Sequence, residues 1–242
     1  MNIPQSAFEV ARLAPEPTQA PFPDLVAFKT AERDLAPPVA LTRKLGPRVA
    51  IYRAGDAAEF TYEMIDGGAI LWTMLPDGRR QIVQMIRPGD AFGFAALDQH
   101  DATAVTTVTS RIRVVPLAQS TRSLMSQGAL LRQALARIRA LQAHALLLGR
   151  MTALERVAHF LLTAFCASPG SDGSAHDGGD HIRLFVTREE IGDYLGLTIE
   201  TVSRNLGKLR RSGIIALDHA DRIRLIDHSA LAAIAGPVGE PS

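Results

Sequence analysis

The sequence predicts an α+β protein with an N-terminal β-roll, a long dimerisation helix and a C-terminal winged helix-turn-helix. Three observations predict this class. Short β-type runs separated by turn dipeptides fill the first half of the chain, and a proline-free stretch with helical periodicity follows them. Two short amphipathic segments around a glycine then precede two further β-type runs. With 242 residues, the chain is long enough for two domains that each bury a core.

The composition is that of an ordinary globular protein. Hydrophobic residues make up 47% and charged residues 21%, and a formal net charge of +1 neither favours nor excludes binding to nucleic acid. The single cysteine, Cys166, excludes an internal disulfide, a CxxC pair and a cysteine-rich metal site. No basic and apolar leader opens the sequence, and no apolar stretch is long enough to span a bilayer. We therefore expect a cytoplasmic protein with no metal site and no membrane partner.

Residues 24–118 are expected to form the β-roll. Turn dipeptides recur in this region at roughly 10 to 13 residue intervals, which is typical of a sandwich or jelly roll: Ala54-Gly55, Gly67-Gly68, Asp77-Gly78 and Pro88-Gly89. Residues 1–23 are rich in Pro and Ala and have no period, so we expect them to form a flexible arm.

Residues 119–150 are expected to form the dimerisation helix, with a break at Gly128. Apolar residues at alternating steps of three and four form a seam of about three heptads: Leu131, Ala134, Ile138, Leu141, Ala145 and Leu148. Such a stripe could also dock only on the protein's own β-roll. A second apolar face favours a twin helix as well, because it leaves the seam available: Leu130, Leu135, Leu146 and Leu147.

Residues 151–236 are expected to form the winged helix domain, followed by a tail at 237–242. Thr187 and Glu190 have the spacing of a capping box at the start of a short helix. Gly196 is suited to a tight turn, and Thr198 is placed to cap the next helix, whose buried stripe is Val202, Leu206 and Leu209. The runs IIAL and IRLI after Ser212-Gly213 predict a hairpin, the wing.

The polar face of the second helix predicts DNA binding. Arg204 can bind guanine bidentately and Glu200 can accept from the amino group of cytosine, so these two and Ser203 are the expected base contacts. A solvated face is the alternative, but the capping box and glycine turn favour recognition. Further residues are expected to contact phosphates or flank the site: Thr187, Arg188, Thr198, Thr201, Asn205, Lys208, Arg210 and Arg211.

Over about residues 39–236 the chain resembles the CRP/FNR family of regulators, and within it the FNR and FixK branches. The most specific segment is EIGDYLGLTIETVSRNLGKL, in which Glu200, Ser203 and Arg204 occupy the E-x-x-S-R positions that FNR-like proteins use to read TTGA half-sites. The segments AIYRAGDAAEFTYEMIDG, LPDGRRQI, PGDAFG and LERVAHFLL also match. The resemblance implies that the β-roll is a cyclic-nucleotide-binding-like jelly roll.

Two departures from the family pattern indicate the branch. Cyclic-nucleotide-binding relatives use an Arg-Ser or Arg-Thr pair for the phosphate, where this chain has Asp101-Ala102-Thr103. Oxygen-sensing relatives ligate an iron-sulfur cluster with several cysteines, which this chain lacks. The resemblance therefore implies a FixK-like homodimer without a cofactor that acts on a TTGA-N6-TCAA-like palindrome with RNA polymerase. As an activator, it would control microaerobic, nitrogen-fixation or denitrification genes.

Three alternatives remain. A haem-dependent gas sensor of the same family would use a histidine such as His100, His144 or His159. An enzyme is not expected, because no paired carboxylates, Ser/His constellation or phosphate loop has a meaningful spacing. Cys166 could be a redox thiol, but its place at the end of an apolar run favours a packed small hydrophobe.

Overall fold

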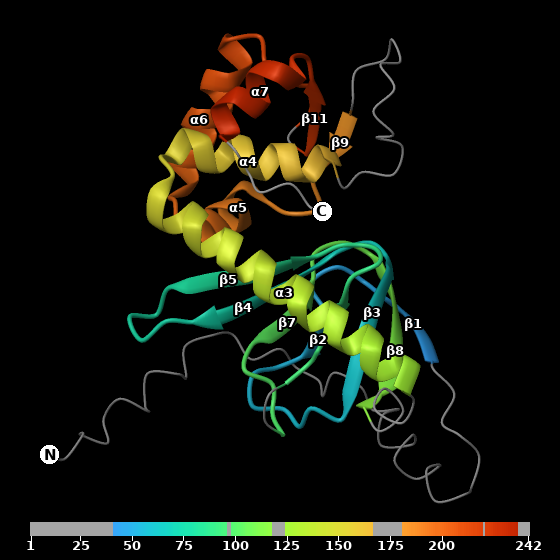
Figure 1. Cartoon of the computed structure of the whole chain (residues 1–242). Helices are drawn as coiled ribbons and strands as arrows, with labels where there is room; N and C mark the ends of the chain where they lie inside the picture. Colours follow the sequence, from blue (N-terminus) through green and yellow to red (C-terminus); the bar gives the residue numbers. More distant parts are fainter. Residues whose placement is uncertain (1–40, 96–97, 118–123, 167–180, 220, 237–242) are drawn as a thin grey trace, which may run out of the picture. The chain divides into compact units, whose positions relative to one another are not determined.

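Among the residues that the computed structural model describes, eight strands form two four-stranded antiparallel sheets in the N-terminal part (Figure 1). The structure describes residues 41–95, 98–117, 124–166, 181–219 and 221–236. The expected arm at 1–23, the Gly-rich segment at 168–180 and the tail at 237–242 lie outside these ranges. The strands are β1 (Leu41–Leu45), β2 (Ala50–Tyr52), β3 (Phe60–Asp66), β4 (Ala69–Met74), β5 (Arg80–Ile86), β6 (Ala91–Phe92), β7 (Thr103–Thr106) and β8 (Ser110–Pro116).

The two sheets enclose the core of the β-roll. Their strand orders are β1-β8-β3-β6 and β2-β7-β4-β5, so neighbours in space are often distant in sequence, as in a jelly roll. Alternate residues of β8 point inward, and Met64, Phe92 and Ile112 are fully buried between the sheets. Tyr52 and Tyr62 stack beside Phe92 in the same core, so aromatic rings occupy much of the interior of the roll.

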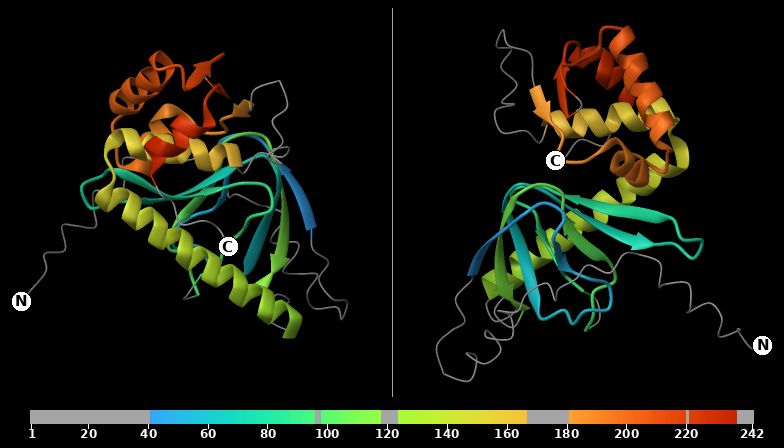
Figure 2. Two further views of the ribbon diagram at one scale, coloured as in Figure 1. Left: turned by 45° about the horizontal axis from the view of Figure 1, so that its top comes forward. Right: turned by 180° about the vertical axis from the view of Figure 1, so that it is seen from behind.

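A long helix, α3 (Leu124–Arg150), runs alongside the β-roll and leads into α4 (Ala153–Cys166) (Figures 1 and 2). The expected break at Gly128 is wrong, because the helix continues through this residue. A single glycine costs a helix only about 1 kcal/mol, which a helix of this length tolerates. None of the helices in the described ranges combines the length and the apolar character that crossing a bilayer requires.

The C-terminal part consists of β9 (His181–Arg183), α5 (Arg188–Leu195), α6 (Ile199–Arg211), β10 (Ile215–Leu217), β11 (Arg222–Leu225) and α7 (His228–Ala235). The expected hairpin is β10 and β11, and β9 joins it as a third strand in the order β10-β11-β9. The strand β9 and the helix α7 are additions to the sequence prediction. Asp227 caps α7 by accepting from the backbone N–H of Ala230 at 2.9 Å.

One apolar cluster joins the two parts of the described chain. Ile70 on β4 and Ile82 on β5 belong to the same buried cluster as Leu161 of α4 and Ile191 of α5. The second sheet therefore packs on one face against the roll's own core and on the other against the helical region.

Candidate DNA-binding interface

A capping box begins α5, as the sequence predicts. The hydroxyl of Thr187 accepts from the backbone N–H of Glu190 at 3.2 Å, and the carboxylate of Glu190 accepts from the backbone N–H of Thr187 at 2.8 Å. Glu190 is buried, and its other carboxylate oxygen pairs with Arg48 of the β-roll. Arg48 has a φ of 62°, a left-handed conformation that costs a non-glycine residue about 1 kcal/mol. A buried helix cap therefore depends on a distant arginine that sequence reasoning did not identify.

The turn between α5 and α6 depends on two glycines. Gly196 has φ 65° and ψ 40°, and its N–H donates to the carbonyl of Gly192, which ends α5 as expected. Gly192 was not predicted to matter. A Cβ there would lie 2.6 Å from the carbonyl oxygen of Leu197, so the turn folds back against the helix more closely than any side chain allows.

Arg156 of α4 ties this turn to the end of the long helix. Its guanidinium donates to the carbonyl oxygens of Leu148 at 2.6 Å, Met151 at 3.0 Å and Leu195 at 2.9 Å. These carbonyls belong to the ends of helices, where no intrahelical donor is available. Arg156 thus links α3 and α5 through one side chain, a role that local sequence patterns do not reveal.

The apolar stripe of α6 is buried as predicted, at Val202, Leu206 and Leu209. Thr198 caps the helix by accepting from the backbone N–H of Thr201 at 3.3 Å. Asn205 differs from its expected position. It is 4% exposed, and its side-chain amide donates to the carbonyl of Thr201 at 2.9 Å, so it lies with the buried stripe rather than on the exposed face.

Glu200 lies one helical turn before the adjacent Ser203 and Arg204 on α6, away from the buried stripe. Glu200 and Arg204 are exposed and Ser203 is half-buried. The pKa of Glu200 lies below its usual value because its own backbone N–H and the Thr198 hydroxyl donate to the carboxylate, and Arg204 adds a smaller attraction. Glu200 is therefore an ionised acceptor, and the exposed Arg204 offers a planar donor beside it.

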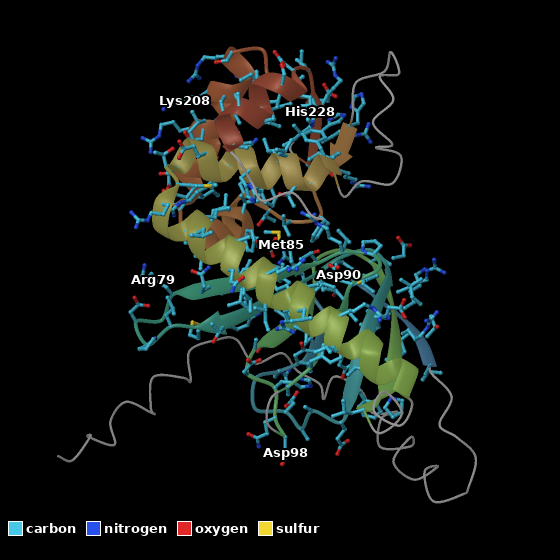
Figure 3. The ribbon with its side chains drawn as sticks, viewed as in Figure 1. Arg79, Met85, Asp90, Asp98, Lys208 and His228 are labelled. Atoms are coloured by element: carbon cyan, nitrogen blue, oxygen red, sulfur yellow. The ribbon has the colours of Figure 1, made fainter. Side chains whose placement is uncertain are left out.

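The basic residues expected at phosphates surround this face. Lys208, which is labelled in Figure 3, is exposed at the end of α6, and Arg210 and Arg211 are exposed as well. Within the part of the chain that the structure describes, none of them takes part in an ion pair. Thr187 and Thr198 are exposed, whereas Arg188 and Thr201 are half-buried; a guanidinium nitrogen of Arg188 lies 3.5 Å from the Ser203 hydroxyl. The end of α6 thus carries three exposed positive charges.

The long helix presents a broad apolar surface. Leu131, Ile138 and Leu141 of the expected seam are 62%, 51% and 49% exposed. Leu135 and Leu146, expected on the second face, are exposed as well, at 52% and 64%. Ala134 and Ala145 are exposed, but Leu148 is half-buried and packs against the C-terminal core. The exposed apolar face is therefore wider than the seam and ends before Leu148.

The remaining candidate residues lie elsewhere. His100 is buried in the β-roll, where its ring stacks on Tyr52 with centroids 3.7 Å apart. His144 stacks on Tyr194 of α5, far along the chain. Cys166 is the last residue of α4, but its side chain lies outside what the structure describes, so both readings of this thiol stay predictions.

Comparisons with known proteins agree with this architecture. The family model described as a Crp-like helix-turn-helix domain matches residues 155–234, and that of the cyclic nucleotide-binding domain matches residues 42–127. The solved structure of FixK2 from Bradyrhizobium japonicum has a TM-score of 0.74 and 32% identity, covering 83% of this chain and 100% of that chain.

Two relatives extend the likeness over nearly the whole length. The nitrogen fixation regulation protein FixK of Rhizobium meliloti (strain 1021) is 36% identical over 234 residues, which are 96% of this chain and 95% of that protein. FixK of Azorhizobium caulinodans is 34% identical over 243 residues, covering 93% of this chain and 97% of that protein. Both are regulators rather than enzymes. The chain thus belongs to the CRP/FNR family of DNA-binding transcription regulators, on its FixK-like branch.

Proposed function

We propose that this regulator binds a TTGA-N6-TCAA-like palindrome as a homodimer and activates transcription with RNA polymerase in the cytoplasm. The observation that carries the proposal is the exposed face of α6, where an ionised Glu200 lies one turn from Ser203 and Arg204. The FixK relatives are named as nitrogen fixation regulators, which supports nitrogen-fixation, microaerobic or denitrification genes as targets.

The chemistry of this face suits a TTGA half-site. Arg204 would donate two hydrogen bonds to a guanine, and Glu200 would accept from the amino group of the paired cytosine. Lys208, Arg210 and Arg211 would contact the phosphates, which fixes the register of α6 in the major groove without adding sequence preference. Thr187, Arg188, Thr198 and Thr201 would flank the site.

Two copies are needed to read both half-sites. The exposed apolar face of α3 supports a parallel pairing of two helices around Leu131, Ala134, Ile138, Leu141 and Ala145. Pairing there would remove large leucine and isoleucine side chains from water, and it would repeat α6 about 34 Å away on the same side of the duplex.

DNA binding without an added nucleotide is supported by the β-roll. Ala102 is buried at the place where the family's phosphate-binding arginine is expected, and the Thr103 hydroxyl accepts from the backbone N–H of Ala54 at 3.1 Å. The stacked rings of Tyr52, Tyr62 and His100 further favour a filled roll over a nucleotide or haem pocket.

A gel-shift titration with no ligand tests the proposal. The probe is a duplex with TTGA-N6-TCAA, and the control duplex carries the same bases with both half-sites scrambled. We expect specific binding to be about 10³-fold or more tighter than binding to the control at physiological salt. Equal affinity for the two duplexes would refute the proposed site while leaving family membership intact.

A further inference from the structure

A cavity of about 370 Å³ lies where β5, α3, α4 and α5 meet, away from the recognition face of α6. Gln84, Arg87 and nearby apolar residues line it from the β-roll side, and Arg137 and His144 line it from α3. His159 of α4 and Tyr194 of α5 complete the wall. The cavity therefore borders the β-roll, the long helix and the first helix of the helix-turn-helix.

Four buried polar atoms around this cavity have no hydrogen-bond partner within the described ranges: Gln84 Oε1, both ring nitrogens of His144 and Nδ1 of His159. Buried polar atoms are almost always hydrogen-bonded in folded proteins, so four such atoms around one cavity form an unusual cluster. A neutral imidazole carries one N–H and one acceptor nitrogen, so His144 offers one donor, and His159 offers a donor in the tautomer with the hydrogen on Nδ1. An occupant with acceptor oxygens would satisfy these N–H donors, whereas Gln84 Oε1 is itself an acceptor and would need an N–H or O–H group.

The charges around the cavity favour an anion. Arg87 and Arg137 both line it, and neither takes part in the ion pairs found among the described residues. The guanidinium of Arg87 makes one long hydrogen bond, 3.3 Å to the carbonyl of Thr163. Asp90 is the one carboxylate in the lining; burial raises its pKa, and it accepts from the backbone N–H of Arg87. A carboxylate entering the cavity would meet two guanidinium groups against this single acid.

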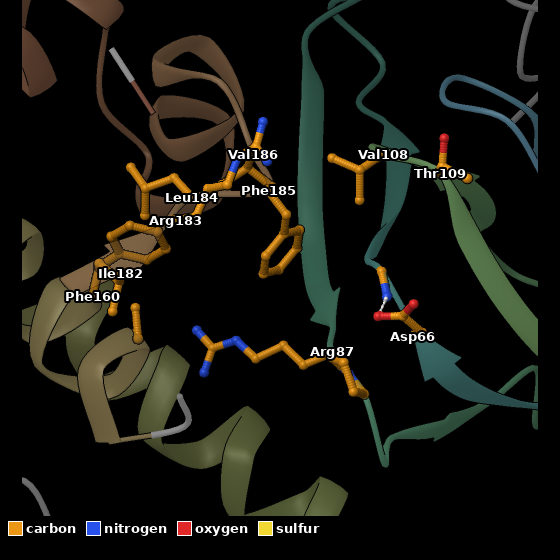
Figure 4. Close-up of a pocket in the computed structure, with 13 residues that line it drawn as sticks. Asp66, Arg87, Val108, Thr109, Phe160, Ile182, Arg183, Leu184, Phe185 and Val186 are labelled. Carbon is orange, nitrogen blue, oxygen red and sulfur yellow. Dashed lines mark hydrogen bonds between the residues drawn. The ribbon is translucent and has the colours of Figure 1, made fainter. Parts of the chain in front are cut away.

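Apolar side chains also line the cavity, so the part of the occupant that contacts them should be apolar. Met85, Leu141 and Phe160 face the cavity. Figure 4 shows Arg87 reaching from the end of β5 toward Phe160 across an adjoining cavity of about 560 Å³ that the same two residues line. A planar hydrocarbon body fits this apolar wall, while a charged end would lie against the arginines and histidines.

We propose that this cavity is a binding site for a small organic carboxylate with an aromatic or hydrocarbon body. The carboxylate lies between Arg87 and the histidines, and the apolar body packs against Met85 and Phe160. Because Tyr194 stacks on His144 with centroids 4.3 Å apart, an occupant also contacts the helix that leads into the DNA-reading turn. The proposal does not rest on the proposed DNA sequence, because binding of the carboxylate is measured in the absence of DNA.

Titration calorimetry on the full-length protein tests this site, with phenylacetate as the probe and uncharged phenylacetamide as its isosteric control. We expect saturable binding of one phenylacetate per chain, at least about tenfold tighter than the amide, because two charge-assisted contacts are lost with the amide. Arg87→Met and His159→Leu should each weaken phenylacetate binding by about tenfold or more. Arg79→Met and His228→Gln remove an exposed arginine and an exposed histidine outside the cavity and should bind like the wild type.

Three outcomes would overturn the proposal: no saturable binding of phenylacetate, equal binding of acid and amide, or cavity variants that bind like the two controls. Thermal melts and the ligand-free gel shift on the TTGA-N6-TCAA duplex check that the cavity variants are folded. If His159→Leu fails to fold, His159→Gln retains a donor at this position and should keep most of the affinity. A protein that binds the palindrome but not phenylacetate separates failure of this site from failure of the proposed function.

Discussion

Arg80 on β5 holds the carboxylate of Asp193 on α5 by two hydrogen bonds, from Nε at 2.8 Å and from Nη2 at 2.6 Å. The neighbouring Gln81 donates to the backbone carbonyl of Asp193 at 2.6 Å. Both charged side chains are partly shielded from water, with exposed fractions of 29% and 24%. The β4–β5 hairpin therefore fixes the first helix of the helix-turn-helix, which couples the β-roll to the DNA-reading unit.

Replacing Arg80 with Met should lower the free energy of unfolding by about 1 to 3 kcal/mol, because it leaves a partly buried carboxylate without its partner. Arg79→Met is the matched control. Arg79 pairs with Asp77 on the same hairpin, but the two side chains are 77% and 50% exposed, so this pair should contribute close to nothing. Denaturant titrations of both variants measure the difference, and equal losses would argue against the coupling role of Arg80.

Gly192→Ala should destabilise the protein by about 2 kcal/mol or more, because its Cβ would press into the carbonyl of Leu197 and force the turn apart. Gly207→Ala on α6 is the control. A Cβ at Gly207 meets no atom closer than the side-chain nitrogen of Arg211 at 3.4 Å, so the higher helix propensity of Ala should leave stability equal or raised by up to about 1 kcal/mol. Thermal unfolding of the pair distinguishes steric from propensity effects, and the prediction fails if both variants behave alike.

Local patterns in the sequence predicted the helix-turn-helix well because its determinants lie within a few residues of one another. Thr187 and Glu190 are three residues apart, and Gly196 directly follows the helix that it ends. The contacts of Arg48 and Arg80 with α5 span 142 and 113 residues, and no local pattern encodes such pairs. Asp227 before an apolar run has the local pattern of an N-cap, which indicates α7. The polar amide of Asn205 suggested a DNA contact, but this amide donates a hydrogen bond to a carbonyl of its own helix.

Arg204→Ala should cost about 1 to 3 kcal/mol of binding free energy and relax the preference at one guanine per half-site. Arg211→Ala is the comparison, because a phosphate contact contributes equally on every sequence. Its loss should weaken binding to matched and scrambled duplexes alike and reduce the salt dependence of binding. Gel shifts on both duplexes give the specificity ratio. If Arg204→Ala leaves that ratio unchanged, Arg204 contacts only the phosphate backbone.

Ile138→Glu should convert the protein to monomers with poor DNA affinity, because pairing would bury two like charges close to the two-fold axis. Ala136→Glu, an exposed position off the seam of the same helix, should remain dimeric. Sedimentation velocity at micromolar concentration separates the two states. A dimer formed by Ile138→Glu would place the interface elsewhere.

Stability should fall on the acid side of neutrality, because burial lowers the pKa of His100, His144 and His159. In the unfolded chain these histidines titrate near a pKa of about 6.5, so the unfolded state takes up protons first as the pH falls. Their neutral forms are therefore compatible with full stability above about pH 6.5, and stability decreases below that value by at most about 1.4 kcal/mol per pH unit for each histidine.

His144→Phe keeps a ring against Tyr194 but removes one titrating group, so it should flatten the dependence of stability on pH between about pH 7 and about pH 5.5. Denaturant titrations across this pH range measure the slopes for the variant and the wild type, and identical slopes would contradict a buried, neutral His144.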